Sequence, residues 1–379
     1  MVQGLKTVSL FDGISCGRVA LDHAGFRVSS YSAFEIDKYA RAINRYNYPD
    51  TKHHGDVLGA DFRQFADCDI VIGGSPCTFW SIAKQNREVN KDGIGWKLFM
   101  RFVEAVRQIQ PRYFLYENVA SMPKEIKSYI SEEFACEPIL INSALVSAQH
   151  RKRLYWTNIQ GITQPDDKGV LLKDILENGI TARNKSYCID ACYYKGGNHS
   201  SPHKQSAKRL MVYEPIALSM DSQKVGLFDD VGAALRTRID ENGSFKRLEI
   251  RDDGKLNAIT TVLTDSVVCS PVRVGTLGAG GQGNRIYSVQ GKTISLMANG
   301  GGRGAKTGLY KIDLPDGNYI VRKLTVIEAE RCQTLPDNFT ALGIDDNGNT
   351  VKISNTQRYR AIGNGFTVEV IAHILRHMQ

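Results

Sequence analysis

Short apolar runs alternate with amphipathic stretches over the first 159 residues of the chain. The runs are rich in β-branched and aromatic side chains, which predicts buried strands. They lie at 6–11, 28–34, 68–72, 113–116, 140–145 and 154–157. Between them, apolar residues at helical spacing predict amphipathic helices, most clearly from Trp96 to Ile109. This alternation is typical of a parallel sheet covered by helices, so the pattern predicts a Rossmann-like α/β domain.

The strand–helix alternation stops after Ile159 and returns near residue 321. Residues 160–320 are rich in Gly, Ser, Thr and Asn and contain short β-like runs, so we expect a smaller, β-rich domain there. The returning segment predicts a helix with Thr325 as N-cap, since Glu328 completes a capping box. An amphipathic run from Val368 to Leu375 predicts a closing helix. The expected organisation is a first part of the α/β domain at 1–159, the β-rich domain at 160–320, and a return to the α/β domain at 321–379.

A glycine-containing turn follows the first predicted strand. Residues 12–17 lie between that strand and a helix that ends near Gly25, so backbone amides of the turn can approach a ligand closely. The second strand ends at Glu35, whose carboxylate is placed to accept hydrogen bonds from a ribose diol. Asp56 provides a further carboxylate at a later turn. The turn lacks the G-x-G-x-x-G pattern, which disfavours a dinucleotide-dependent dehydrogenase.

A cysteine and a glutamate follow two of the predicted strands. The run Val71-Ile72-Gly73-Gly74-Ser75-Pro76-Cys77 reads as a buried strand, a sharp turn and a thiol at the strand's carboxyl end. Glu117 ends the next strand and is expected at the same edge of the sheet. The thiol suits a nucleophile and the carboxyl an acid, but a small buried cysteine and a structural carboxyl are the alternatives. The polar stretch from Ser81 to Lys97 is expected to be a mobile loop beside this edge.

Two arginines precede the last strand of the first segment. Arg151 and Arg153 stand two positions apart in an extended run, so their side chains point to one face and can converge on one anion or polar base.

Charge and cysteine content narrow the class of protein. The chain has 379 residues, a formal net charge of +8 and a pI of about 9.0, which permits a polyanionic partner. Two glycine-rich stretches, 275–283 and 299–308, are loops whose bare backbone could press against a nucleic acid, and the second carries Arg303 and Lys306. Eight thinly spread cysteines favour reduced thiols, and Cys188 and Cys192 are interpreted as structural because no second ligand pair follows. No run could span a bilayer and no signal peptide is present, so we expect a cytoplasmic protein without a membrane partner.

The ordered set of motifs resembles the DNA (cytosine-5) methyltransferase family. The matching runs are Phe11 to Gly17, Glu35, Asp56, Gly74 to Cys77, Glu117-Asn118-Val119, Gln149 to Arg153, Arg322 to Pro336 and Gly363-Asn364-Gly365. The family usually has Gln after its Pro-Cys pair, whereas this chain has Thr78, and the surrounding run looks closer to the de novo branch of animal enzymes. The long variable segment instead looks bacterial or phage-like.

The resemblance implies that S-adenosylmethionine is the cofactor. The residues it assigns to the cofactor are Phe11, Asp12, Gly13, Ser15, Cys16, Gly17, Glu35, Ile36, Asp56, Val57, Pro76, Leu98, Asn364 and Thr367. Glu35 would hold the ribose and Asp56 the adenine, on which Leu98 would pack. Asn364 and Thr367 would lie near the methionine end.

The resemblance also assigns the chemistry. Cys77 would attack carbon-6 of a flipped-out cytosine, Glu117 would hold and protonate ring nitrogen-3, and Arg153, supported by Arg151, would hold the base. The implied partner is double-stranded DNA, contacted by Ser81, Arg303 and Lys306, with residues 160–320 as a target-recognition domain. We expect no metal, a monomer in a bacterial or phage-infected cell, and a cognate restriction endonuclease that acts separately.

Other functions fit the sequence less well. A transfer RNA methyltransferase shares these motifs but typically has a shorter recognition region. An amino-methylating DNA enzyme would need an Asn/Asp-Pro-Pro-aromatic motif, which is absent. A catalytically silent DNA-binding protein on this fold would not need Cys77, Glu117 and Arg153 together. A Rossmann oxidoreductase would explain Glu35 but not the Pro76-Cys77 pair.

Overall fold

The structure is a computed structural model that describes residues 4–82, 86–179, 181, 184–193 and 323–378, together with the strands of the intervening region. The chain forms two compact units. The first comprises Met1–Glu177, Ala182–Tyr194 and Leu324–Gln379, and the second comprises Asn178–Thr181 and Lys195–Lys323. The first unit therefore continues beyond residue 159, where the sequence pattern places the end of the first α/β segment.

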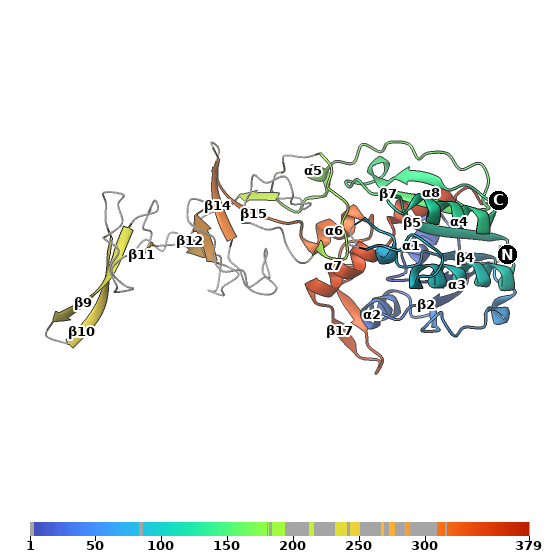
Figure 1. Cartoon of the computed structure of the whole chain (residues 1–379), viewed down its shortest axis with the longest axis horizontal. Helices are drawn as coiled ribbons and strands as arrows, with labels where there is room; N and C mark the ends of the chain where they lie inside the picture. The colour runs from blue at the N-terminus through green and yellow to red at the C-terminus, as the bar shows by residue number, and fades with distance from the viewer. Residues whose placement is uncertain are drawn as a thin grey trace. The chain divides into compact units, whose positions relative to one another are not determined.

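A seven-stranded sheet with the order β3-β2-β1-β4-β5-β7-β6 organises the first unit (Figure 1). The strands are β1 (Leu5–Leu10), β2 (Val28–Phe34), β3 (Lys52–His53), β4 (Ile70–Gly73), β5 (Tyr113–Val119), β6 (Ile139–Asn142) and β7 (Lys152–Thr157). The first five run parallel, whereas β7 is antiparallel to both of its neighbours. Because β1 lies between β2 and β4, the strand order reverses at β1, and ligands of open α/β sheets gather at the carboxyl ends beside such a point. The predicted α/β fold is confirmed.

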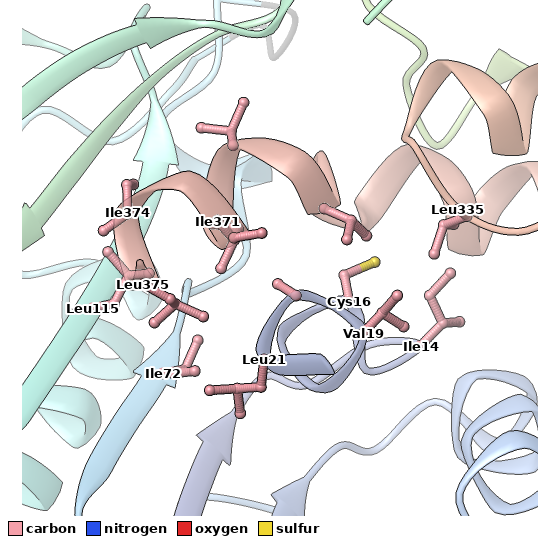
Figure 2. Close-up of a cluster of buried hydrophobic side chains, with 14 of the residues drawn as sticks. Ile14, Cys16, Val19, Leu21, Ile72, Leu115, Leu335, Ile371, Ile374 and Leu375 are labelled. Atoms are coloured by element: carbon pink, nitrogen blue, oxygen red, sulfur yellow. The ribbon is translucent and has the colours of Figure 1, made fainter. Parts of the chain in front are cut away.

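Helices cover both faces of this sheet. They are α1 (Cys16–His23), α2 (Lys38–Asn47), α3 (Ile94–Ile109), α4 (Lys124–Phe134), α5 (Leu172–Ile175), α6 (Val326–Cys332), α7 (Asn355–Asn364) and α8 (Val368–Leu375). Strand residues alternate between the two faces: Ile70 and Ile72 belong to the core with α1 and α8, and Val71 belongs to the core with α3 and α4. Figure 2 shows the first of these cores, where Ile72 and Leu115 face the apolar side chains of α1 and α8.

Local sequence signals explain where several of these elements begin and end. The capping box at Thr325 is confirmed, because its side chain accepts from the Glu328 amide at the start of α6. Helix α3 begins at Ile94, two residues before the predicted start. The predicted strand at 140–145 was too long, since the Asn142 side chain accepts from the Ala144 amide and turns residues 143–145 into a 3-10 helix. Helices α4, α5 and α7 were not predicted from the sequence.

The second unit is described only by its strands. A five-stranded sheet has the order β12-β13-β14-β15-β8, and a three-stranded sheet has the order β10-β9-β11. The bounds are β8 (Val212–Pro215), β9 (Gly232–Asp240), β10 (Gly243–Ile250), β11 (Val267–Val268), β12 (Arg273–Thr276), β13 (Arg285–Ser288), β14 (Leu309–Leu314) and β15 (Gly317–Arg322). All of these pairings are antiparallel except that of β13 with β14. The β-rich character that the sequence predicts is thus present, whereas Arg303 and Lys306 lie outside the described residues.

Candidate active site

The turn after β1 is held in shape from the inside. Asp12 is buried, and its carboxylate accepts hydrogen bonds from the Ser15 hydroxyl, from the Tyr31 hydroxyl (2.7 Å) and from the Asn44 amide (3.4 Å). The pKa of Asp12 is raised on balance, because burial raises it by more than these hydrogen bonds lower it. Of the predicted cofactor residues in this turn, Asp12, Ser15, Cys16 and Gly17 are buried, whereas Phe11 and Gly13 are partly exposed. A ligand could reach the turn at these two residues.

The backbone of this turn is unusual in a way that suits ligand binding. Phe11 and Ser15 have φ values of 57° and 60°, in the left-handed region that non-glycine residues seldom adopt. Such local strain is concentrated at functional sites in proteins. Gly13, also at φ 57°, has open space where a Cβ would stand. Gly13 can thus bring its backbone against a ligand without a side chain in the way.

Glu35 connects the turn to the end of β2. Its two carboxylate oxygens accept from the Gly13 amide at 2.8 Å and from the Asp37 amide at 2.7 Å. The pKa of Glu35 is raised on balance, because burial raises it by more than the two amide hydrogen bonds lower it. A carboxylate has about four acceptor positions, so two remain for a hydroxyl pair on a ligand.

The remaining predicted cofactor residues of the first segment lie at neighbouring turns. Ile36 follows Glu35 and is 69% exposed, an unusual position for a large apolar side chain. The exposed Asp56 accepts from the Leu58 amide at 2.9 Å, while Val57 between them is buried. Leu98 on α3 is partly buried against the second core.

Two glycines allow the strand that carries the candidate nucleophile to pass closely between its neighbours. A Cβ at Gly73 would stand 2.4 Å from the Leu10 carbonyl oxygen of β1, and one at Gly74 would stand 2.6 Å from the Glu117 carbonyl oxygen of β5. Only glycine fits at such distances. The chain then turns at Pro76, and Cys77 begins a short 3-10 helix (η2, Cys77–Phe79).

The turn before Cys77 is fixed to β5 by hydrogen bonds. The Ser75 and Tyr116 hydroxyls lie 2.6 Å apart, and the Asn118 amide donates to the Ser75 carbonyl at 3.1 Å. All three side chains are buried. The carboxyl ends of β4 and β5, and with them Cys77 and Glu117, are therefore held at one edge of the sheet, as the sequence predicts.

Glu117 and Arg153 form a nearly buried ion pair. Arg153 Nε lies 2.9 Å from Glu117 Oε1, and side-chain exposure is 12% for the arginine and 11% for the glutamate. Burial alone would lower the pKa of Arg153, but the negative groups around it raise that pKa instead. Burial raises the pKa of the Cys77 thiol, Arg153 and Arg151 oppose this, and Glu117 adds to it. On balance the pKa of the Cys77 thiol is raised, chiefly by burial, so the neutral thiol is favoured here, and the two arginines are the groups that oppose this.

Arg151 has a different environment from Arg153. Its guanidinium donates to the carbonyl oxygens of Ile189 (2.9 Å) and Gly365 (2.8 Å) and is 3% exposed as a residue. It therefore clamps the segment around Gly365 onto the sheet. The two arginines do converge, as predicted, but they do so on the sulfur of Cys188, at 3.3 Å from Arg151 Nη1 and 3.8 Å from Arg153 Nη2.

A buried polar network joins the arginine segment to the C-terminal part of the unit. Gln149 Nε2 donates to the Cys332 carbonyl (2.6 Å) and to Gln333 Oε1 (2.9 Å). The same Gln333 oxygen accepts from the Thr367 hydroxyl at 2.8 Å, and that hydroxyl accepts from Ser143 at 2.9 Å. Thr367 is thus buried in this network, whereas Asn364 is exposed. Gln149 and Gln333 therefore help to hold the arginine segment in place, a role that the sequence pattern does not indicate.

The described residues of the predicted loop after Cys77 form hydrogen bonds with neighbouring segments. The Ser81 amide donates to the Cys77 carbonyl at 2.9 Å, which continues the short helix. Further on, Glu88 accepts from the Gly95 amide at 2.9 Å and Arg87 donates to the Ser121 carbonyl at 2.6 Å.

Among the described residues, no group of three potential ligands could hold a metal ion. In the same part of the chain, no helix combines the length and the apolar character needed to cross a membrane.

Comparison with known proteins identifies related sequences and folds. Residues 5–379 match the family model described as C-5 cytosine-specific DNA methylase. Orphan methyltransferase M.Rho11sI of Bacillus phage rho11s is 27% identical over 329 residues, which is 82% of this chain and 61% of that protein. Type II methyltransferase M.HhaI of Haemophilus parahaemolyticus is 26% identical over 371 residues, which is 98% of this chain and 93% of that protein. The solved structure of Spodoptera frugiperda DNMT2 shares the fold, with a TM-score of 0.51 at 14% identity over 99% of each chain.

Proposed function

The chain belongs to the C-5 cytosine-specific DNA methylase family, and we propose that it transfers a methyl group from S-adenosylmethionine to carbon-5 of a cytosine flipped out of double-stranded DNA. The observation that carries this proposal is the ion pair between Glu117 and Arg153 at the strand edge that also presents Cys77. The reaction needs a nucleophile, an acid and a cation at one place, and these three groups supply them.

Carbon-5 of cytosine is too weak a nucleophile to take a methyl group unaided. The Cys77 thiolate adds to carbon-6, which makes the ring electron-rich at carbon-5. Glu117 hydrogen-bonds ring nitrogen-3 and supplies the proton that neutralises the adduct. Arg153 stays beside Glu117, holds the base and favours the negative charge at the site, with Arg151 supporting it. After methylation a base or water takes the carbon-5 proton, and the electrons of that bond re-form the double bond between carbon-5 and carbon-6. The bond from sulfur to carbon-6 breaks with release of the Cys77 thiolate, and nitrogen-3 returns its proton to Glu117.

The turn after β1 and the end of β2 fit the methyl donor. Glu35 has free acceptor positions for a ribose diol, Gly13 presents open backbone, and the exposed Ile36 offers an apolar surface for an adenine ring. Bound there, S-adenosylmethionine would supply an electrophilic methyl group on a sulfonium. Asp56, Leu98, Asn364 and the other predicted contacts remain predictions.

Residues of the second unit are assigned target recognition in this proposal. Its strands lie in the segment that separates the two parts of the α/β domain, and the predicted DNA contacts Arg303 and Lys306 belong to it. Ser81, next to Cys77, is assigned a contact from the catalytic side. The relatives include an orphan methyltransferase and a type II methyltransferase. We further propose that the protein is a monomer and that a cognate restriction endonuclease acts separately from it.

Two measurements test the proposal. Cytosine methylation mapped by sequencing of DNA incubated with the protein and S-adenosylmethionine should reveal one short recognition sequence. Duplex DNA with 5-fluorocytosine at that position should become covalently attached, because fluorine cannot leave as a proton does, and the Cys77→Ala variant should form no adduct. A full-strength adduct in that variant would end the assignment of Cys77. Methylation of transfer RNA in place of DNA would redirect the proposal to RNA.

A further inference from the structure

Cys188 lies between two parts of the candidate site that are far apart in sequence. The segment that carries it runs beside residues 148–150, since the Ser186 amide donates to the Ala148 carbonyl (2.7 Å) and the His150 amide donates to the Ser186 carbonyl (2.9 Å). On its other side, a Cβ at Gly363 would stand 2.2 Å from the carbonyl carbon of Asp190. The backbone at Gly363 is therefore packed directly against that of Asp190, which restricts the position of the segment around Cys188.

The sulfur of Cys188 is a shared acceptor for the two arginines. Arg151 has further partners in the carbonyls of Ile189 and Gly365. Arg153, in contrast, is held on the site side by the Glu117 ion pair and by this sulfur, its other hydrogen bond being to the adjacent Lys152 carbonyl. The sulfur is therefore the side-chain contact of Nη2, while Nη1 donates to the Lys152 carbonyl at 2.9 Å.

The charges around the two thiols are coupled. Burial would raise the pKa of Cys188, but Arg151 and Arg153 outweigh this and lower it. Among the groups that act on Cys77, Arg153 and Arg151 lower its pKa, whereas Glu117 and Cys188 raise it. Arg151 and Arg153 thus lower the pKa of both thiols, that of Cys188 and that of Cys77, the proposed nucleophile.

We propose that Cys188 is a positioning residue for methyl transfer, which holds Arg153 against Glu117 and shares the arginine charge with Cys77. This inference rests on the proposed function of the site. A buried cysteine that only fills space would not need two guanidinium groups on its sulfur, since apolar packing suffices for such a role. Cys332 illustrates that other case: it is fully buried, and burial raises its pKa.

The test compares three variants of the full-length protein. Cys188→Ala removes the acceptor, Cys188→Ser retains a neutral acceptor, and Cys192→Ser is the control, because Cys192 is exposed in the same segment. Single-turnover methylation should slow by about tenfold in the alanine variant, the scale of one lost hydrogen bond to a charged group. The serine variant should recover most of the rate, and DNA affinity should stay the same in all three.

Alkylation of Cys77 by iodoacetamide, followed by peptide mass spectrometry across a pH series without DNA, gives a second readout. Removal of the Cys188 thiol, which raises the pKa of Cys77, should lower that pKa, so alkylation at a fixed pH below the midpoint should quicken by about threefold in both Cys188 variants. Wild-type methylation in Cys188→Ala, a serine variant as slow as the alanine one, or an unchanged Cys77 profile would each overturn the inference. If Cys188→Ala does not fold, the serine variant and its alkylation profile decide.

The two proposals fail in different ways. A wild-type protein that methylates no cytosine refutes the proposed function, whereas the Cys77 alkylation profile still reports on Cys188. A wild-type protein that methylates DNA, together with Cys188 variants that behave like the Cys192 control, refutes the role of Cys188 alone.

Discussion

Gly74→Ala should disable the site from within the sheet. The added methyl group would stand 2.6 Å from the Glu117 carbonyl oxygen, 3.1 Å from Glu117 Oε2 and 3.3 Å from the Phe366 ring. The nearest of these is backbone of a central strand, which cannot move without separating β4 from β5. Overpacking of this kind costs about 1–3 kcal/mol of unfolding free energy. The strands that separate carry Cys77 and Glu117, so a shift of even about 1 Å should slow methylation roughly 100-fold.

The matched control is Gly59→Ala, where nothing lies within 4 Å of the new methyl group. This substitution should leave stability unchanged or raise it by about 0.4–1 kcal/mol, because alanine restricts the unfolded chain. Urea denaturation followed by circular dichroism measures the first effect, and single-turnover methylation measures the second. If Gly74→Ala matched the control in both assays, the two strands would not be as close at this point as the geometry requires.

Three further predictions concern the cofactor site, the pH dependence of stability and the second unit. Glu35→Ala should weaken S-adenosylmethionine binding by about 1–3 kcal/mol in calorimetry, the scale for lost hydrogen bonds to a charged acceptor, and unchanged affinity would move the ribose elsewhere. The pKa of Glu369 is lowered on balance: burial raises it, but the hydrogen bonds from Lys168 and His23 lower it by more. The ionised carboxylate therefore stabilises the fold at pH values above the ordinary glutamate pKa, and this stabilisation is lost as the pH falls through the lowered pKa. Glu369→Gln should thus cost about 1 kcal/mol at pH 7 and almost nothing at pH 3 in urea titrations; an equal cost at both values would contradict the assignment. Arg303→Ala with Lys306→Ala should weaken DNA binding and reduce its salt slope by about one per lost phosphate contact, with S-adenosylmethionine affinity unchanged; a normal slope would remove both residues from the interface.

Sequence patterns predicted those parts of the site that depend on single strands. The apolar runs that end at Gly73 and at Glu117 are local signals, and the parallel alternation brings their carboxyl ends to one edge. Cys77 and Glu117 could therefore be placed together from the sequence. Helix α7 carried no such signal, because few of its side chains are apolar and only Tyr359 and Ile362 supply large buried ones.

The role of Arg151 shows why contacts far apart in sequence escape such reasoning. Alternation along an extended run correctly placed Arg151 and Arg153 on one face, but it could not reveal what that face meets. The partners of Arg151 lie 38 residues away at Ile189 and 214 residues away at Gly365. Cys188 was interpreted as structural for the same reason, since its significance lies in the two guanidinium groups that the fold brings to it.

The buried network around Gln149 explains why the chain must return to its first domain to complete the site. A buried amide without partners is costly, so Gln149 is tolerated only where both ends of its side chain are satisfied. Its nitrogen donates to the Cys332 carbonyl and to Gln333, and its oxygen accepts from the Ile189 amide at 3.2 Å. These partners lie on either side of the main part of the second unit in sequence, which spans Lys195–Lys323. The arginine segment that follows Gln149 is therefore held in its site geometry by residues from both flanks of the inserted unit, which couples the placement of Arg153 to closure of the whole α/β domain.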